Sequence, residues 1–308
     1  MSGGPDHDDA HDCHNEGFPP RHALREGGLT LVATPIGNLG DFSPRAQAAL
    51  READLVLCED TRVTARLLQH YGISVRTGAL HDHNEEQRLP GLVQQLREGV
   101  RIALVSDAGM PVMSDPGYRL VRAVTEAGLP LTAVPGPNAA LTALVLSGLP
   151  PHPFMFLGFP PPREAARLES FRTLRAAELA GLHATLIWHE APHRVADMVA
   201  DLADVFGTGR QVVIARELTK RFEELLRGDG VSLAKRCRED PPRGEMTVLI
   251  APPAAEEEDG AADLDERLVA ALEHSSVRDA AAIVAKASGL PRRTVYARAL
   301  ELAALRGA

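Results

Sequence analysis

The chain has 308 residues, of which 44% are hydrophobic and 24% charged, a profile typical of a globular protein large enough for two domains. No stretch approaches the roughly 18 consecutive apolar residues of a membrane-spanning helix, and the Asp- and His-rich start does not resemble a secretory signal. Three widely spaced cysteines fit a reducing compartment, so we expect a cytoplasmic protein.

The net charge of −9 is unevenly distributed along the chain. Residues 1–16 carry five acidic side chains and residues 252–266 carry seven, and neither segment has a Lys or Arg. Without these twelve acidic residues, 33 basic residues face 30 acidic ones, and the last 42 residues hold seven basic residues against three acidic ones. The acidic total therefore does not exclude a nucleic-acid partner.

Residues 1–27 lack hydrophobic periodicity, and we expect a disordered N-terminal extension. The histidines of its segment HDDAHDCHNE could hold a metal ion, but scattered histidines in a flexible tail rarely form a fixed site. We therefore expect no metal centre there.

The next part of the chain alternates short apolar runs with amphipathic segments, which predicts a parallel sheet covered by helices. The expected strands lie at residues 29–33, 54–59, 101–106 and 131–135. Helices are expected near residues 44–53, 61–71, 88–98, 117–127 and 138–148. The segment LPPHP at 149–153 is typical of an interdomain linker, so the first α/β domain is predicted to span residues 28–150.

The second half predicts another α/β domain, at residues 151–252, with a mixed sheet because two of its strands follow each other directly. Strands are expected at 154–159, 184–190, 211–217, 222–228 and 245–251, and helices near 163–180, 192–206 and 231–239. An acidic linker at 253–263 then leads to a tail at 264–308 with helices at 264–274, 277–287 and 291–305. The string AAAIVAKASGLPRRTVYARAL within this tail resembles a helix–turn–helix.

Three loops of the first domain are rich in Gly, Pro, Ser and Asp, and each follows a predicted buried strand: residues 33–44, 105–121 and 134–144. Loops at the carboxyl ends of parallel strands are where open α/β sheets bind ligands. Gly and Pro also make ordinary turns, and the G-x-G-x-x-G pattern of dinucleotide-binding proteins is absent. Three such loops at one sheet edge nevertheless favour a shared small-ligand site.

Two further loops carry charged and imidazole side chains. EDTRVT at 59–64 follows the second strand, and LHDHNEEQR lies at 80–88. His81 and His83 beside Asp82 could bind a metal, although this local spacing brings no third ligand, and a solvated loop is a further alternative. We favour a substrate-facing polar surface.

Together these strings resemble the ribosomal RNA small-subunit methyltransferase I family, within the tetrapyrrole methylase fold class. The resemblance covers roughly residues 29–251, and the helical tail is similar to the family's C-terminal extension. It rests on the ordered motifs TPIGN (34–38), EDTR (59–62), LHDHNE (80–85), SDAGMPVMSDPG (106–117), PGP (135–137), HR (193–194), ARELTK (215–220) and GEM (244–246). Two residues depart from the family pattern, because His189 stands where a Tyr is expected and Ala191 where a Ser is expected.

The resemblance implies two α/β domains with a small helical extension, S-adenosylmethionine bound between the domains, and a homodimer. It further implies methylation of the ribose 2′-hydroxyl of a cytidine in the decoding region of small-subunit ribosomal RNA. Two alternatives remain: methylation of a tetrapyrrole or another small molecule, and a non-enzymatic nucleotide-binding regulatory module. The EDTR and LHDHNE segments and the basic tail favour the RNA substrate.

By the same resemblance, the cofactor contacts come from the three loops and from the second domain. They are Pro35, Gly37, Ser106, Asp107, Ala108, Val112, Ser114, Pro135, Gly136, Asn138, Glu217, Leu218 and Met246.

A ribose hydroxyl is a weak acid, so a general base is expected near it. The candidates are Glu59 and His81, followed by Asp60 and His83. The cationic residues expected to contact RNA are Arg62, Arg194, Lys220, Arg292 and Arg293. For Arg62 and Lys220, a structural salt bridge to a neighbouring acid is the alternative.

Overall fold

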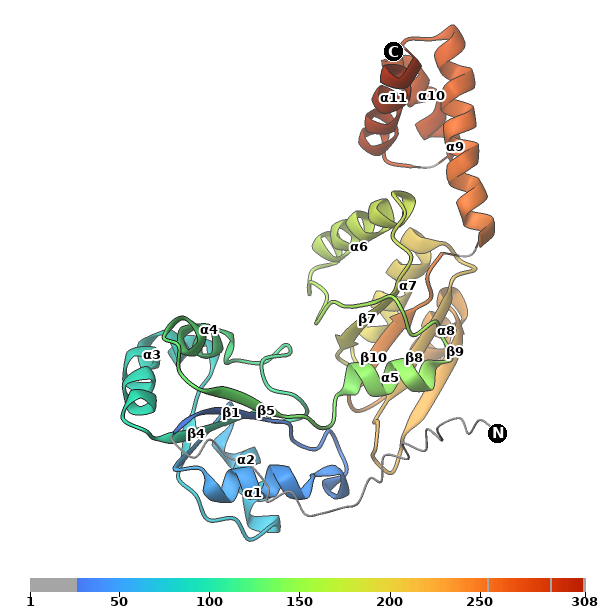
Figure 1. The fold of residues 1–308 in the computed structure, drawn as a ribbon. Helices are drawn as coiled ribbons and strands as arrows, with labels where there is room; N and C mark the ends of the chain where they lie inside the picture. Colours follow the sequence, from blue (N-terminus) through green and yellow to red (C-terminus); the bar gives the residue numbers. More distant parts are fainter. Residues whose placement is uncertain (1–26, 254, 289, 307–308) are drawn as a thin grey trace, which may run out of the picture. The chain divides into compact units, whose positions relative to one another are not determined.

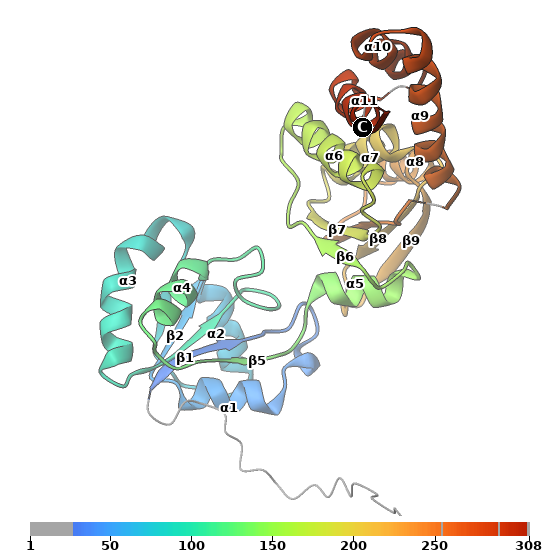
Figure 2. The same cartoon turned by 45° about the horizontal axis from the view of Figure 1, so that its top comes forward.

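The computed structural model describes residues 27–253, 255–288 and 290–306 (Figures 1 and 2). Its chain forms two compact units, which meet in the sequence between Asn138 and Ala139. Apart from Gly27, the predicted N-terminal extension and its candidate metal-binding histidines lie outside the described residues.

The first unit contains a five-stranded sheet in the order β3-β2-β4-β1-β5, and every neighbouring pair in it is parallel. Its strands are β1 (Gly28–Val32), β2 (Leu55–Cys58), β3 (Thr77–Ala79), β4 (Arg101–Val105) and β5 (Leu131–Val134). Four of these strands match the predicted ones. β3 was not predicted, because its three residues Thr-Gly-Ala form no apolar run.

Helices cover both faces of this sheet (Figure 1). They are α1 (Pro44–Glu52), α2 (Thr61–His70), α3 (Asp82–Arg97) and α4 (Tyr118–Glu126), with a short 3-10 turn at Leu39–Asp41. Successive strand residues point to opposite faces, so Val56 packs with α1 and α2 whereas Leu57 packs with α3 and α4. Burial on both faces explains why the strands are continuously apolar.

The second unit contains a mixed sheet in the order β6-β7-β10-β8-β9, as the sequence predicts. Only β6 and β7 are parallel, and the other neighbours are antiparallel. Its strands are β6 (Phe154–Phe156), β7 (Thr185–Glu190), β8 (Gln211–Arg216), β9 (Glu224–Asp229) and β10 (Met246–Ile250). Its helices before the tail are α5 (Ala139–Ser147), α6 (Glu164–Leu179), α7 (Val195–Phe206) and α8 (Gly230–Glu239).

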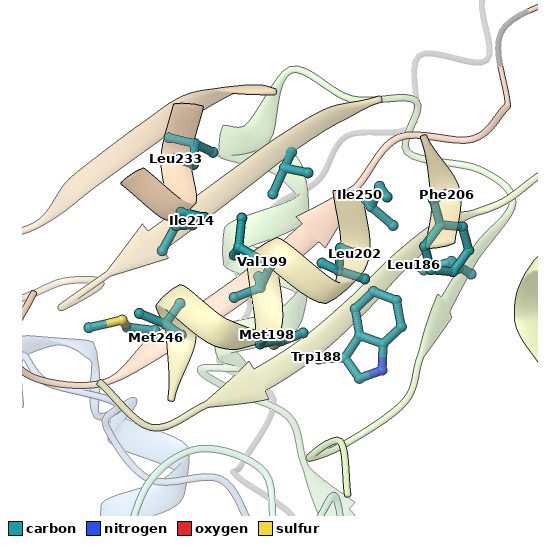
Figure 3. Packing of buried hydrophobic residues seen from close by; sticks show 14 of the residues in the cluster. Leu186, Trp188, Met198, Val199, Leu202, Phe206, Ile214, Leu233, Met246 and Ile250 are labelled. Atoms are coloured by element: carbon teal, nitrogen blue, oxygen red, sulfur yellow. The ribbon is translucent and has the colours of Figure 1, made fainter. Parts of the chain in front are cut away.

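One face of this sheet packs on α6, α7 and α8 around large apolar side chains (Figure 3). Trp188 of β7 is 1% exposed and meets Phe171 of α6 edge-on, with ring centroids 5.4 Å apart. Met198 and Leu202 of α7 complete this part of the core. The helices therefore fix one face of the sheet and leave the strand ends free to carry polar side chains.

The position of α5 differs from the prediction, which placed this segment in the first domain. Its residues Ala139–Ser147 belong to the second unit and pack against β7, β8, β9 and β10. The helix is apolar along almost its whole length, AALTALVLS, so it buries one side wherever an apolar sheet face is available. The change of domain therefore comes before the helix and not at LPPHP.

The tail forms three helices, α9 (Ala255–His274), α10 (Val277–Ser288) and α11 (Arg292–Arg306), around a small core that includes Leu268, Val284 and Val295. From residue 255 onward, the predicted acidic linker is part of α9. Ala and Glu are strong helix formers, and here this propensity prevails over the local negative charge. No helix among the described residues is long and apolar enough to cross a membrane.

A buried charged network ties α6 to the second sheet. The Glu178 carboxylate at the end of α6 accepts two hydrogen bonds from Arg210, at 3.0 and 2.9 Å, and one from Arg175 at 3.0 Å. Arg210 precedes β8 and also donates to the Ala251 carbonyl after β10, at 2.8 Å. Because Glu178 and Arg210 are both buried, removing the Glu178 carboxylate takes a hydrogen-bonded counter-charge away from a buried guanidinium.

Replacement of this carboxylate should therefore destabilise the second unit. We expect Glu178→Ala to lower its free energy of unfolding by about 3–5 kcal/mol. Trp188, the chain's single tryptophan, can report urea unfolding of this unit by its fluorescence. The control is Glu169→Ala, whose exposed pair with Arg172 spans 3.9 Å and should contribute about 0–1 kcal/mol. Equal midpoints for the two variants would contradict a stabilising role for the network.

Candidate functional site

The polar motifs of the first unit gather at one edge of its sheet. Because all five strands are parallel, the segments after them start at the same edge. In the spatial order β3, β2, β4, β1, β5, these segments are LHDHNE, EDTR, SDAGMPVMSDPG, TPIGN and PGPN. The three predicted cofactor loops are therefore neighbours, and the two loops with acidic and imidazole groups lie beside them.

Hydrogen bonds join the loops after β1 and β4. Thr34 N donates to Gly109 O at 2.8 Å, and Gly109 N donates to Thr34 O at 3.1 Å. The Thr34 hydroxyl donates to the Ser106 carbonyl at 3.1 Å, and the Ser106 hydroxyl donates to Gly109 O at 2.9 Å. Ser106, a predicted cofactor contact, is buried and uses its hydroxyl to shape the loop.

The loops after β4 and β5 have the tight backbone geometry typical of ligand-binding segments. Val112 and Ser114 have φ angles of 75° and 67°, a left-handed conformation that is unfavourable for both residue types. Strained backbone of this kind persists where the surrounding structure holds it, often at functional sites. At the loop after β5, a Cβ on Gly136 would lie 2.9 Å from the Ala33 Cβ, so only glycine permits this close approach.

The other predicted cofactor residues of this unit lie in the same three loops. Gly37, Ala108, Pro135 and Gly136 are exposed, and Pro35 is buried. Asp107 and Asn138 are intermediate in exposure. The Asp107 Oδ1 accepts a hydrogen bond from Asp60 N at 3.2 Å, which links the loops after β4 and β2.

Three carboxyl groups interact at this edge: Glu59, Asp107 and Asp115. Burial raises the pKa of Glu59, and the charges of Asp107 and Asp82 raise it further. Burial, then the charges of Glu59 and Asp107, raise the pKa of Asp115 to about 7. Asp115 is absent from the predicted site residues, because an Asp beside Pro116 and Gly117 looks like a turn residue.

Asp60 and Arg62 form a close ion pair, which is the structural alternative left open by the sequence. The Arg62 guanidinium lies 2.6 Å from Asp60 Oδ2, and Arg62 N donates to Asp60 Oδ1 at 2.8 Å. The Asp60 side chain thus caps α2, and hydrogen bonds from Arg62 lower its pKa to about 2. So weak a base is poorly suited to take a proton from a hydroxyl, which favours Glu59 over Asp60.

The start of α3 is internally hydrogen-bonded. His81 N donates to Asn84 Oδ1 at 2.9 Å, and the Asn84 amide nitrogen lies 3.1 Å from His81 Nε2. The contact to Asn84 occupies Nε2 of the His81 ring, so this nitrogen is not open to a substrate. The neighbouring His83 is exposed, and its ring centroid lies 6.1 Å from that of His81.

Glu85 of the same motif connects α3 to the loop after β4. It is 3% exposed, and its Oε1 accepts a hydrogen bond from Leu120 N in the first turn of α4 at 2.9 Å. The N-cap of α4 is Gly117, which has no side chain to perform this task. A carboxylate is also favoured electrostatically at a helix N-terminus. Glu85 therefore has a structural role that holds the end of the strained loop.

The predicted cofactor residues of the second unit have well-defined partners within that unit. Met246 and Leu218 are buried, and Met246 belongs to the core. The Glu217 carboxylate accepts hydrogen bonds from Lys220 Nζ at 2.8 Å and from Glu245 N at 3.0 Å. The hydrogen bond from Lys220 lowers the pKa of Glu217. Lys220 therefore forms an ion pair, which is the structural alternative to RNA contact that the sequence left open.

Arg194 and His189 also lie in the second unit. Arg194 donates to the buried Glu190 carboxylate and to the Pro160 carbonyl, each at 2.9 Å. His189, the departure from the family pattern, has its Nδ1 3.1 Å from the Thr247 hydroxyl, and burial lowers its pKa. Its ring centroid lies 4.9 Å from that of Phe156, so His189 packs against an aromatic neighbour, as a Tyr at this position could.

Comparison with known proteins gives consistent matches over nearly the whole chain. The model of the tetrapyrrole (corrin/porphyrin) methylases matches residues 28–234, and that of the RsmI C-terminal HTH domain matches residues 258–303. Ribosomal RNA small subunit methyltransferase I from Escherichia coli O157:H7 is 42% identical, over 90% of this chain and 96% of the relative. The protein of the same name from Micromonospora olivasterospora is 47% identical, over 88% of this chain and 85% of the relative.

Solved structures show the same fold at lower sequence identity. The methyltransferase CobJ aligns with a TM-score of 0.53 and 20% identity, over 74% of this chain and 95% of CobJ. A diphthine synthase aligns with a TM-score of 0.54 and 17% identity, over 76% of this chain and 94% of the synthase. The motifs, the fold and the matched length agree: the chain belongs to the ribosomal RNA small subunit methyltransferase I family, within the tetrapyrrole methylases.

Proposed function

We propose that this methyltransferase transfers a methyl group from S-adenosylmethionine to the ribose 2′-hydroxyl of a cytidine in the decoding region of small-subunit ribosomal RNA. The observation that carries the proposal is the edge of the first sheet, where three ligand-type loops adjoin loops with acidic and imidazole groups. The names of the relatives support ribosomal RNA as the substrate. Such a substrate favours a cytoplasmic location.

The residues of this edge fit S-adenosylmethionine. The loops 33–42, 106–117 and 135–138 contain no Lys or Arg, and the second of them includes Asp107 and Asp115. A sulfonium is a cation, so carboxylates and backbone carbonyls suit it better than a basic pocket would. Gly136 lets the loop after β5 lie close against Ala33, at the start of the loop after β1. When bound, the cofactor supplies an activated methyl group.

Glu59 is the best-placed general base. It follows β2, beside the loop after β4, and its raised pKa makes it a stronger proton acceptor than an ordinary Glu. In our proposal, its carboxylate takes the proton of the ribose hydroxyl. Asp107 and Asp115 make the local electrostatic potential more negative. The loops contribute chiefly by alignment, which lowers the barrier without strong acid–base assistance.

Glu59→Gln should therefore impair methyl transfer selectively. With labelled S-adenosylmethionine and small ribosomal subunits that lack the modification, we expect the wild type to label RNA ribose. We expect kcat to fall about 10²- to 10⁴-fold in Glu59→Gln, with cofactor binding retained. Glu126→Gln, at an exposed carboxylate paired with Arg122 on α4, is the control and should leave the rate unchanged. Cofactor binding without any transfer to RNA would refute the proposal and support a regulatory module.

The pH profile of the same reaction tests the base more directly. Glu59 accepts a proton only above its pKa, so the rate should rise with pH through that value. Because the charge of Asp82 raises the pKa of Glu59, Asp82→Asn should move the rising limb to lower pH. Asp82 is exposed on α3, so the substitution leaves the core intact. An unmoved limb would assign the titration to another group.

We also propose that the helical tail contacts RNA phosphates. Arg292 and Arg293 are exposed at the start of α11. Arg298, in contrast, pairs with Asp265 at 2.6 Å and holds α11 to α9. The family model that matches this region describes a helix–turn–helix domain, a type of unit that often binds nucleic acids.

Loss of both exposed arginines should weaken the electrostatic part of RNA binding. We expect the double variant Arg292→Ala, Arg293→Ala to reduce the slope of log Kd against log salt by about 1.4–1.8, at roughly 0.7–0.9 for each phosphate contact. Cofactor affinity should not change. The double variant Arg97→Ala, Lys235→Ala removes the same charge elsewhere on the surface and is the control. An unaltered slope in the tail variant would make the tail a solvated appendage.

The homodimer implied by the family resemblance has a candidate surface on α5. Val145 is 74% exposed, and Leu141 and Leu146 of the same helix are also exposed. An apolar strip on a helix is typical of subunit interfaces, which bury about 800 Å² or more on each partner. We propose that two copies of the chain associate through this helix.

A charge in the middle of that strip should separate the subunits. We expect Val145→Asp to change the mass in light scattering from that of a dimer to that of a monomer, because an unpaired carboxylate would be buried in the interface. Val231→Asp, at a valine of α8 that is 52% exposed, is the matched control and should remain dimeric. A dimer in both variants would place the interface elsewhere.

A further inference from the structure

The connection between β8 and β9 is held in a strained and closely bonded conformation. Glu217 and Thr219 have φ angles of 51° and 66°, which are unfavourable for residues other than glycine. Thr219 N donates to the Glu223 carboxylate at 2.7 Å, and Lys220 N donates to Glu217 O at 3.0 Å. Gly244 leaves the room that the Glu217 side chain needs, since a Cβ there would overlap it. The segment is therefore rigid.

This rigid segment exposes an aromatic ring and a guanidinium together. Phe222 is 64% exposed, and the Arg221 guanidinium carbon lies 5.5 Å from the centroid of its ring. That distance is within the range of a cation–π contact. The ring and the guanidinium together offer a flat surface on which a planar group of a partner can stack.

The charges around Phe222 limit what that partner can be. Lys220 is engaged by Glu217 and Glu245, and Glu224 is engaged by Arg216 and Arg236. The acidic groups of this segment are thus largely compensated, and the Arg221 side chain lies on the exposed ring. One ring with one guanidinium is much smaller than the surface of a stable protein interface. It is comparable in size to a single nucleobase.

We propose that Arg221 and Phe222 form a stacking surface for an unpaired nucleobase of the RNA substrate. Single-stranded RNA is commonly held by stacking its bases on aromatic rings and on arginine planes. The rigid backbone spares the entropy of ordering the segment on binding. This inference rests on the proposed RNA substrate, and it assigns to the second unit a contact with a base in addition to phosphate contacts.

The surface can be tested with a fluorescent stacking partner. Phe222→Trp places an indole in the stacking surface. The chain's one native tryptophan, Trp188, is buried and gives a constant background. We expect single-stranded oligocytidine RNA to quench the new emission, and double-stranded RNA of equal length to quench it far less. Phe154→Trp, at an exposed phenylalanine of β6 in the same unit, is the control and should not respond.

Binding measurements separate stacking from simple apolar contact. Phe222→Leu keeps an apolar side chain without a ring and should raise the Kd for oligocytidine, and the KM for small subunits, about 5- to 150-fold. Phe222→Trp should stay close to the wild type, and the affinity for S-adenosylmethionine should be equal in all three proteins. A phenylalanine that served only the fold would show neither this split nor rescue by Trp.

Two results would overturn the proposal. One is Phe222→Leu binding RNA as the wild type does, with no quenching of Phe222→Trp. The other is emission of Phe222→Trp that depends on protein concentration in the absence of RNA, which would make the stacking surface a contact between copies of the chain. If the wild type methylates ribosomal RNA and either result is found, only the stacking surface fails. If the wild type neither binds nor methylates RNA, the proposed function itself fails.

Discussion

The parallel direction of all five strands in the first sheet is the constraint on which the rest of this unit depends. It brings segments that are up to about 100 residues apart in the sequence to one edge, in the order β3, β2, β4, β1, β5. The loop after β4 lies between the acidic loops and the other two ligand loops. Its first end is held by hydrogen bonds between Thr34 and the segment Ser106–Gly109. Its second end is held by Glu85, which caps α4. A fixed loop between both groups of segments is what the alignment of two substrates requires.

The electrostatics of this edge follow from which carboxylates have partners. Asp60 is neutralised by Arg62 and by the start of α2, and Glu85 is compensated by the start of α4. Glu59, Asp107 and Asp115 lack such strong compensation, and burial raises the pKa of each. A site of this kind favours a bound cation and a proton acceptor at the same time. One sequence motif, EDTR, thus supplies a candidate base and, next to it, a structural cap.

Much of the fold could be predicted, because four strands of the first sheet and four of the second are marked by apolar runs. The three-residue β3 could not, since its hydrogen bonds to β2 and not its composition define it. Nor could the domain of α5, because an apolar helix packs equally well on either neighbour by pattern alone. At the site, the loops were predictable from their Gly and Pro content. The roles of Asp115 and Glu85 depend on groups from other parts of the chain: the charge of Glu59 acts on Asp115, and Leu120 N donates to Glu85.

The acidic edge also bears on the choice between RNA and a small acceptor. Clustered carboxylates repel phosphate groups, so in the proposed function the RNA backbone is not held at the edge that carries Glu59. Its phosphates need cations elsewhere, and Arg292 and Arg293 are exposed on a separate helical tail. The proposed stacking surface of Arg221 and Phe222 would add a contact to an unpaired base of the same RNA. A small tetrapyrrole would need neither the helical tail nor the stacking surface. The acidic edge, the proposed stacking surface and the exposed arginines of the tail therefore suit a long polyanion better than they suit a small tetrapyrrole.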